Sequence, residues 1–187
     1  MSIIERSGDA ARRGMEAIEH ADSLDAPIAQ ANRALDTVLP DGPVKEVLNG
    51  VPLGHPAHPV AVLIPAGAWI SSAVLDFIPG QQRASRLLVG MGLLGAAPAA
   101  ASGIADWSNL DREQQRVGIV HWAANLTAVA LYSASYIQRR RGKHLSGRAL
   151  GLAGLTVISL SGYLGGHLAY AQGANVEGRT AGGDSTP

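Results

Sequence analysis

Four long stretches without a single charged residue constrain this chain more than any other feature. Asp, Glu, Lys and Arg are all absent from residues 59–75, 87–105, 117–137 and 149–172. A charge at the centre of a bilayer is costly, and a helix of about 20 apolar residues crosses the hydrocarbon core. A soluble helix of this length normally keeps a charged stripe towards water. The pattern predicts four membrane-spanning helices, at residues 59–78, 85–106, 117–137 and 149–171.

The composition excludes several classes of function. The 187 residues carry no net formal charge, because 15 Lys and Arg balance 15 Asp and Glu. We therefore expect no nucleic-acid partner, since such binding relies on a basic surface. Cys is absent, which excludes disulfides, thiolate metal sites and Cys nucleophiles. No Walker A, GxSxG, HExxH or Rossmann motif occurs, so the sequence does not assign an enzymatic activity.

The charge is divided unevenly along the chain. Residues 1–50 carry nine acidic and five basic residues, a net charge of −4, and the remainder carries +4. Within this acidic segment, apolar residues at spacings of three and four predict two amphipathic helices, at residues 2–22 and 27–39. The end of the chain is polar and Gly-rich, which is typical of disorder.

We therefore predict an all-α chain with three parts. Residues 1–50 form an amphipathic helical arm that packs on the bundle or on a partner protein. Residues 51–172 form an up-down-up-down four-helix transmembrane bundle, and residues 173–187 form a disordered tail. Binding of the arm to the membrane surface is the alternative, but surface helices usually carry Lys and Arg on their polar face, and this arm is acidic.

Basic residues between the third and fourth predicted spans indicate the orientation. This loop contains Arg139, Arg140, Arg141, Lys143 and Arg148. Loops rich in Lys and Arg lie on the cytoplasmic side of membranes, so both chain ends are expected on the outer side. The sequence thus predicts a multi-pass protein of the cytoplasmic (inner) membrane, with the lipid bilayer as its first partner.

Three histidines and a carboxylate are predicted to meet at one membrane face. His58 begins the first span, Asp106 ends the second, His121 lies four residues into the third, and His167 lies four residues before the end of the fourth. In an antiparallel bundle these positions share one depth. His55 is either a further ligand or a group outside the site.

Angular position predicts which face of each span points inward, because helical residues advance by about 100° each. Polar groups facing lipid are costly, so stripes of polar or small residues should face the neighbouring helices. Asp76 is either a buried proton or ion group or a cap near the helix end. The four predicted stripes are His58, Pro65, Trp69, Ser72 and Asp76; Gly95, Ala99, Ser102 and Asp106; His121, Asn125, Ala128, Tyr132 and Ser135; and Thr156, Tyr163, His167 and Tyr170.

Two kinds of centre suit the predicted cluster. Two imidazoles from His58, His121 and His167 can be the axial ligands of a haem b, with Asp106 orienting one of them. Alternatively, the same three histidines and Asp106 hold Zn, Cu or non-haem Fe. A haem needs two ligands opposed across a wide slot, whereas a small ion needs every ligand within about 2 Å of one point.

The first function hypothesis is electron transfer. A haem b subunit would pass electrons from a membrane donor such as quinol to a separate redox protein on the outer side. The second hypothesis is a membrane protein that uses a non-haem metal or handles protons. The third is a structural or assembly subunit that docks a partner through its arm.

Four sequence blocks carry a family resemblance: GHPAHP at residues 54–59, SGIADW at 102–107, HWAAN at 121–125 and SGYLGGHL at 161–168. Over roughly residues 52–172 the chain resembles an uncharacterised bacterial four-helix membrane family with a GHPxHP signature (domain of unknown function 2231). Some members of that family carry a C-terminal Rieske iron–sulfur domain, which implies electron transfer and places the C-terminus outside. This chain reaches Pro187 without that module, so a redox partner is expected to be separate.

Overall fold

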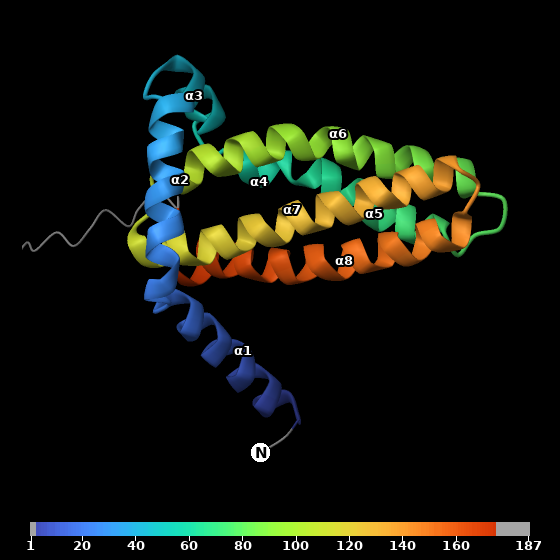
Figure 1. Ribbon diagram of the computed structural model, residues 1–187, viewed down its shortest axis with the longest axis horizontal. Coiled ribbons are helices and arrows are strands. Elements are labelled where there is room, and N and C mark those ends of the chain that lie inside the picture. The colour runs from blue at the N-terminus through green and yellow to red at the C-terminus, as the bar shows by residue number, and fades with distance from the viewer. Residues whose placement is uncertain (1–2, 175–187) are drawn as a thin grey trace, which may run out of the picture.

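The computed structural model describes residues 3–174, and within this range all regular structure is helical. The predicted disordered tail from residue 175 onward lies outside the described residues. Three helices form the arm and five form the bundle (Figure 1). They are α1 (Ile3–Glu19), α2 (Asp25–Val38) and α3 (Pro43–Leu48), followed by α4 (His58–Ala61), α5 (Leu63–Leu75), α6 (Gln82–Trp107), α7 (Arg112–Arg140) and α8 (His144–Gly166).

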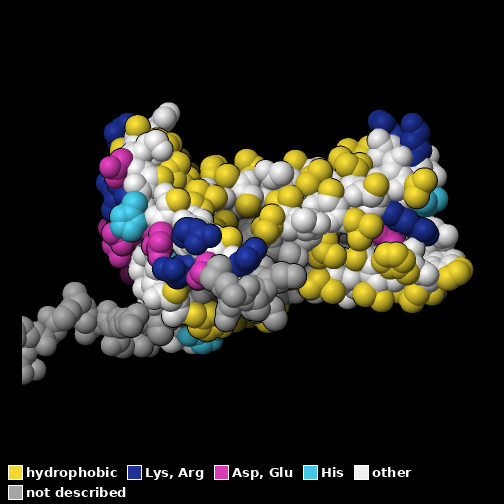
Figure 2. Space-filling model, turned by 90° about the horizontal axis from the view of Figure 1, so that it is seen from below, with side chains coloured by type: hydrophobic (Ala, Val, Ile, Leu, Met, Phe, Trp, Pro, Cys, Tyr) yellow, Lys and Arg dark blue, Asp and Glu magenta, His cyan; other side chains and the backbone are white. Residues whose placement is uncertain are grey.

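Four helical segments are long and apolar enough to cross a membrane. They coincide with the four predicted spans and run antiparallel to their sequence neighbours, which confirms the all-α four-helix bundle (Figure 1). On the face shown in Figure 2, the bundle has a hydrophobic band between two ends at which charged side chains gather. The segments are His58–Leu75, Gln82–Trp107, Arg112–Arg140 and His144–Ala171.

The first span consists of two helices because of a proline. Pro65 has no amide hydrogen, so it cannot donate to the carbonyl of Ala61. The helix is interrupted at Val62, between α4 and α5. The short helix α4 therefore sets the direction of His58 at its first residue.

The bundle contains the same packing pattern twice. We call α4–α6 the first hairpin and α7–α8 the second hairpin. Four buried residues along α5 and at its C-terminal end have a buried counterpart on α7, at the sequence separation of 63 that the Asp76–Arg139 contact shows. The counterparts are Pro65 and Ala128, Trp69 and Tyr132, Ser72 and Ser135, and Asp76 and Arg139.

The second helices of the hairpins repeat their buried positions in the same way. Here the sequence separation is 62, and the buried counterparts on α6 and α8 include Ser85 and Gly147, Val89 and Gly151, Gly92 and Gly154, Ala99 and Ser161, and Ser102 and Leu164. Contacts between a residue and its own counterpart are the mark of a two-fold arrangement. The two hairpins are therefore related by an approximate two-fold axis along the bundle.

An aromatic pair fills the middle of this axis. The rings of Trp69 and Tyr132 stack with centroids 4.1 Å apart and planes 9° apart. Each ring also lies against a glycine of the other helix in its hairpin, Gly92 for Trp69 and Gly154 for Tyr132. The glycines allow the helices to approach closely, as small residues do at helix contacts in membranes.

The predicted inner faces of the first three spans are confirmed, but that of the fourth is wrong. Thr156, Tyr163 and Tyr170 are exposed. The hydroxyl of Thr156 donates to the carbonyl of Leu152 in its own helix, so it needs no partner in the bundle. The inner face of α8 consists instead of small residues, among them Gly147, Gly151, Gly154 and Ser161.

Gly154→Ala should destabilise the bundle. A Cβ at this position would lie 2.9 Å from Tyr132 Cε2, so either the aromatic pair or α8 must move, at a cost of about 1–3 kcal/mol. We expect a lower thermal midpoint in detergent and altered Trp fluorescence. Gly162→Ala is the matched control on the same helix, because its Cβ meets no described atom within 4 Å. Equal midpoints for the two variants would contradict the close approach.

Candidate functional site

Two of the predicted site residues, His58 and His121, meet at the end of the bundle nearest the arm. Their ring centroids are 6.3 Å apart and their planes lie at 87°. The two histidines come from α4 and α7 and have the sequence separation of 63 that relates the hairpins. The imidazole pair therefore lies on the approximate two-fold axis.

Backbone carbonyls orient both imidazoles in the same way. His58 Nδ1 donates to the carbonyl of Ala99 at 2.8 Å, and His121 Nδ1 donates to the carbonyl of Ser161 at 2.8 Å. The two carbonyls belong to counterpart residues of α6 and α8. With the proton held on Nδ1, the Nε2 atom of each ring keeps its lone pair, which is the form that binds metals.

A glycine lies against each ring as well. A Cβ on Gly103 would lie 2.8 Å from His58 Nδ1, and one on Gly165 would lie 3.1 Å from His121 Cε1. Both glycines follow the carbonyl acceptor of their ring by one helical turn. Each imidazole is thus held between a carbonyl and a glycine of its partner helix.

The two Nε2 atoms have different surroundings. His121 Nε2 accepts a hydrogen bond from Asn125 Nδ2 at 3.0 Å. No residue of the range 3–174 makes such a bond to His58 Nε2. The counterpart of Asn125 in the first hairpin is Val62, which has no donor side chain. The pair is symmetric in position but has one free acceptor atom, on His58.

The other predicted site residues lie apart from this pair or beside it. His167 Nε2 is 2.6 Å from Glu19 Oε1 of the arm, and Gln172 Nε2 donates to the same oxygen at 2.8 Å. Asp106 is buried in the last turn of α6, and His55 is exposed in the loop before α4. In the described part of the chain, no group of three or more His, Cys, Asp or Glu residues is placed to hold a metal ion.

The predicted arm packs on the bundle through Arg116. Its guanidinium donates to both carboxylate oxygens of Asp25 at 2.9 Å, to Asp22 Oδ1 at 2.5 Å and to the carbonyl of Glu19 at 2.9 Å. Beneath this contact Met15 is buried against Val117, Leu164 and Leu168 of the bundle. As a result, α2 stands across the end of the bundle that holds the imidazole pair (Figure 1).

At the other end of the axis, Asp76 and Arg139 form a buried ion pair. Arg139 donates to the two oxygens of Asp76 at 2.6 Å each and to Ser85 Oγ at 2.8 Å. Ser85 Oγ in turn donates to Asp76 Oδ1 at 2.7 Å. The side chains of Asp76 and Arg139 are only 6% and 2% exposed.

The placement of Arg139 corrects its assignment to a cytoplasmic loop. Helix α7 continues to Arg140, three residues beyond the predicted span, and the charge of Arg139 is matched by Asp76 inside the bundle. A detectable signal existed: the stripe at residues 58, 65, 69, 72 and 76 recurs at 121, 128, 132, 135 and 139. For Arg116, which begins no stripe, we find no comparable signal in the sequence.

Arg139→Gln should strongly destabilise the protein, because it leaves the buried carboxylate of Asp76 without its partner. Such a loss costs about 3–5 kcal/mol. The double variant Asp76→Asn with Arg139→Gln should recover most of this, since no buried charge remains. Thermal midpoints in detergent measure both effects, with exposed Arg140→Gln as the charge-matched control. A double variant no more stable than Arg139→Gln alone would contradict the pairing.

Docking of the arm should weaken in acid. The hydrogen bond from Arg116 holds the pKa of Asp25 below its usual value. A carboxylate with a lowered pKa stabilises the folded state above its unfolded pKa, and this contribution is lost as the pH falls through the folded value. We therefore expect Asp25→Asn to increase hydrogen–deuterium exchange of α2 at pH 7, and we expect this increase to shrink progressively as the pH falls below about 4, the pKa of a free Asp carboxyl. Asp36 is exposed on the same helix, so Asp36→Asn should not change the exchange of α2 at either pH. An effect of Asp25→Asn that is equally large in acid would contradict the prediction.

Comparison with known proteins agrees with the fold. Residues 54–178 match the model of a family described as a predicted membrane protein (DUF2231). The match begins at the GHPAHP block and includes all four apolar segments. Comparisons with curated proteins and with solved structures give no match. Since the matched region covers more than half of the sequence, the chain belongs to the DUF2231 family of predicted membrane proteins.

Proposed function

We propose that this membrane protein is an electron-transfer subunit in which His58 and His121 are the two axial ligands of one haem b. The observation that carries the proposal is the geometry of the pair, with ring centroids 6.3 Å apart and planes at 87°. Two imidazoles that bind one iron from opposite sides, at about 2 Å each, have ring centres about 6 Å apart. The pair has this spacing.

The hydrogen bonds of the pair support ligation by Nε2. Metal-binding histidines usually donate their other ring N–H to a carbonyl or carboxylate, which fixes the tautomer. The Nδ1 atoms of His58 and His121 make such bonds to Ala99 and Ser161. Binding at His121 Nε2 requires the amide of Asn125 to release that atom.

The number of ligands favours haem over a small ion. A haem iron needs only two side chains, because its other four ligands belong to the macrocycle. A structural or catalytic zinc site needs three or four protein ligands. Within residues 3–174 the histidines come together as a pair, since His167 is bound to Glu19 of the arm.

Small side chains line the axis next to the pair. Pro65 and Ala128 are buried on α5 and α7, and in the sequence they lie between the histidine and the stacked aromatic residue of their span; Ala68 and Ala99 are buried as well. They keep charged groups away from this part of the axis.

The orientation expected for the bundle in the membrane supports electron transfer to a partner on the outer side. Basic residues gather around the turns that join α5 to α6 and α7 to α8, at the end of the bundle opposite the arm. They favour the cytoplasmic side for that end, which would place the imidazole pair and the arm at the outer face of the cytoplasmic membrane. In the proposed role, a haem held by His58 and His121 would supply one-electron redox chemistry between a lipid-soluble donor such as quinol and a separate redox protein on the outer side. The acidic arm would attract a partner with a basic surface.

An absorption spectrum of the full-length protein tests this function. Protein expressed with ample haem supply and purified in detergent should show a Soret band and stoichiometric haem. His58→Ala and His121→Ala should each lose the spectrum of a six-coordinate haem. His167→Gln is the matched control and should keep it. Wild-type protein that lacks both haem and iron would refute the proposal.

One observation favours a second candidate, a site that handles protons or a non-haem metal. His121 has hydrogen bonds at both ring nitrogens, to Ser161 and Asn125, whereas none of the residues 3–174 forms a hydrogen bond with His58 Nε2. Elemental analysis separates the two candidates. Stoichiometric Zn or Cu that disappears in His121→Ala, without a haem spectrum, would favour the non-haem site.

A further inference from the structure

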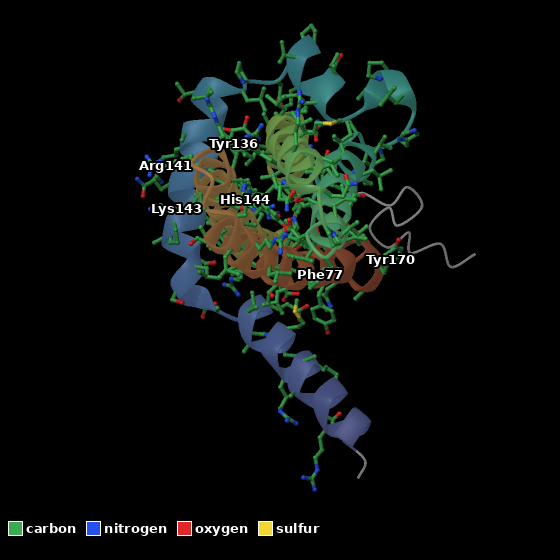
Figure 3. All side chains as sticks on the ribbon, turned by 90° about the vertical axis from the view of Figure 1, so that its right-hand side faces the viewer. Phe77, Tyr136, Arg141, Lys143, His144 and Tyr170 are labelled. Atoms are coloured by element: carbon green, nitrogen blue, oxygen red, sulfur yellow. The ribbon has the colours of Figure 1, made fainter. Side chains whose placement is uncertain are left out.

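The end of the bundle opposite the arm is strongly basic. Figure 3 looks onto this end and shows Arg141 and Lys143 reaching outward on one side, with Phe77 on another. Residues 77–105 and 117–176 contain no Asp or Glu, so among the described helices of the bundle Asp76 is the carboxylate at this end. The basic residues are Arg83, Arg86, Arg139, Arg140, Arg141, Lys143 and Arg148.

A pocket of about 270 Å³ opens on the side of this end, between the end of α5 and the first turns of α8. In Figure 2, a basic side chain lies beside an acidic one at this end of the bundle, with hydrophobic side chains around them. Most of the lining is apolar and belongs to the surface that faces lipid. The pocket is lined by Asp76, Phe77, Leu145, Arg148, Ala149 and Leu152.

Arg148 is the basic group of the pocket, and it makes no hydrogen bond to a carboxylate among residues 3–174. Its Nε lies 3.9 Å from Asp76 Oδ1, which is too long for a hydrogen bond. Asp76 is already neutralised by the two bonds from Arg139. The pocket therefore keeps a net positive charge on Arg148, whose side chain is 35% exposed.

We propose that this pocket binds the phosphate of an anionic phospholipid. The guanidinium of Arg148 donates to the phosphate oxygens, a geometry for which arginine is well suited. The acyl chains lie on Phe77, Leu145 and Leu152, which are 77%, 81% and 42% exposed. Anionic lipid is enriched in the cytoplasmic leaflet, and basic pockets between membrane helices on that side bind such head groups.

The charge and the apolar lining together select this ligand. A free phosphate ion uses Arg148 but gains nothing from the apolar walls of the pocket. A zwitterionic lipid fits the walls, but its choline group brings a positive charge to an end that is already basic. The site is at the opposite end of the axis from the imidazole pair, so it does not depend on the proposed haem.

Native mass spectrometry of the full-length protein in detergent tests the site, with phosphatidylglycerol, phosphatidylcholine and inorganic phosphate as probes. We expect the wild type to retain phosphatidylglycerol in preference to phosphatidylcholine. Arg148→Gln should weaken phosphatidylglycerol binding about tenfold or more, the effect of losing a hydrogen bond between charged groups. Arg148→Lys, which keeps the charge without the planar fork, should give an intermediate loss.

Arg83→Gln is the matched control, because it removes one exposed charge at the same end but outside the pocket. It should leave the lipid preference unchanged, and an equal loss in Arg83→Gln and Arg148→Gln would overturn the proposal. Equal retention of the two lipids would overturn it as well. Displacement of phosphatidylglycerol by millimolar inorganic phosphate would assign the site to free phosphate and overturn the lipid as its occupant. Unchanged thermal midpoints show that the variants are folded.

Discussion

The interaction on which the rest of the structure depends is the contact of each axial residue with its own counterpart in the other hairpin. The two inner faces meet along a shared line, so a side chain there must suit the residue 63 positions away. The three contacts are those of His58 with His121, of Trp69 with Tyr132, and of Asp76 with Arg139. Packing in a membrane draws little on the hydrophobic effect. Shape and polar complementarity along this line therefore hold the hairpins together.

The ends of the axis differ in chemistry because they differ in what covers them. The imidazole pair lies under an acidic arm, which Arg116 and His167 attach to the bundle. The Asp76–Arg139 pair lies under two basic turns, and no other segment of the described chain covers it. A single bundle thus presents an acidic layer at one end and a basic one at the other, with a mostly uncharged interior between them. The proposed haem and the proposed lipid site each use the end whose chemistry suits it.

Much of the fold could be predicted from charge-free stretches and helical periodicity, including the four spans and the inner faces of three of them. The prediction for the fourth span was wrong because it assumed that polar residues mark the face of a helix that points inward. Helix α8 meets α7 through glycines, and Thr156 bonds within its own helix. The contact between His58 and His121 could be predicted because both residues lie at the same depth in the bundle. His167 lies apart from them because it contacts Glu19 of the arm. Glu19 lies outside the two repeated stripes, so its contact with His167 has no counterpart in the sequence pattern.

The pairing of Asp76 with Arg139 also shows what is gained when both hairpins belong to one chain. Two identical hairpins associating as separate molecules would place Asp against Asp, or Arg against Arg, on their symmetry axis. Like charges at that distance in a low dielectric would drive them apart. Covalent linkage allows the two copies to differ at equivalent positions. The halves of this protein are therefore complementary rather than interchangeable, and neither can replace the other by self-association.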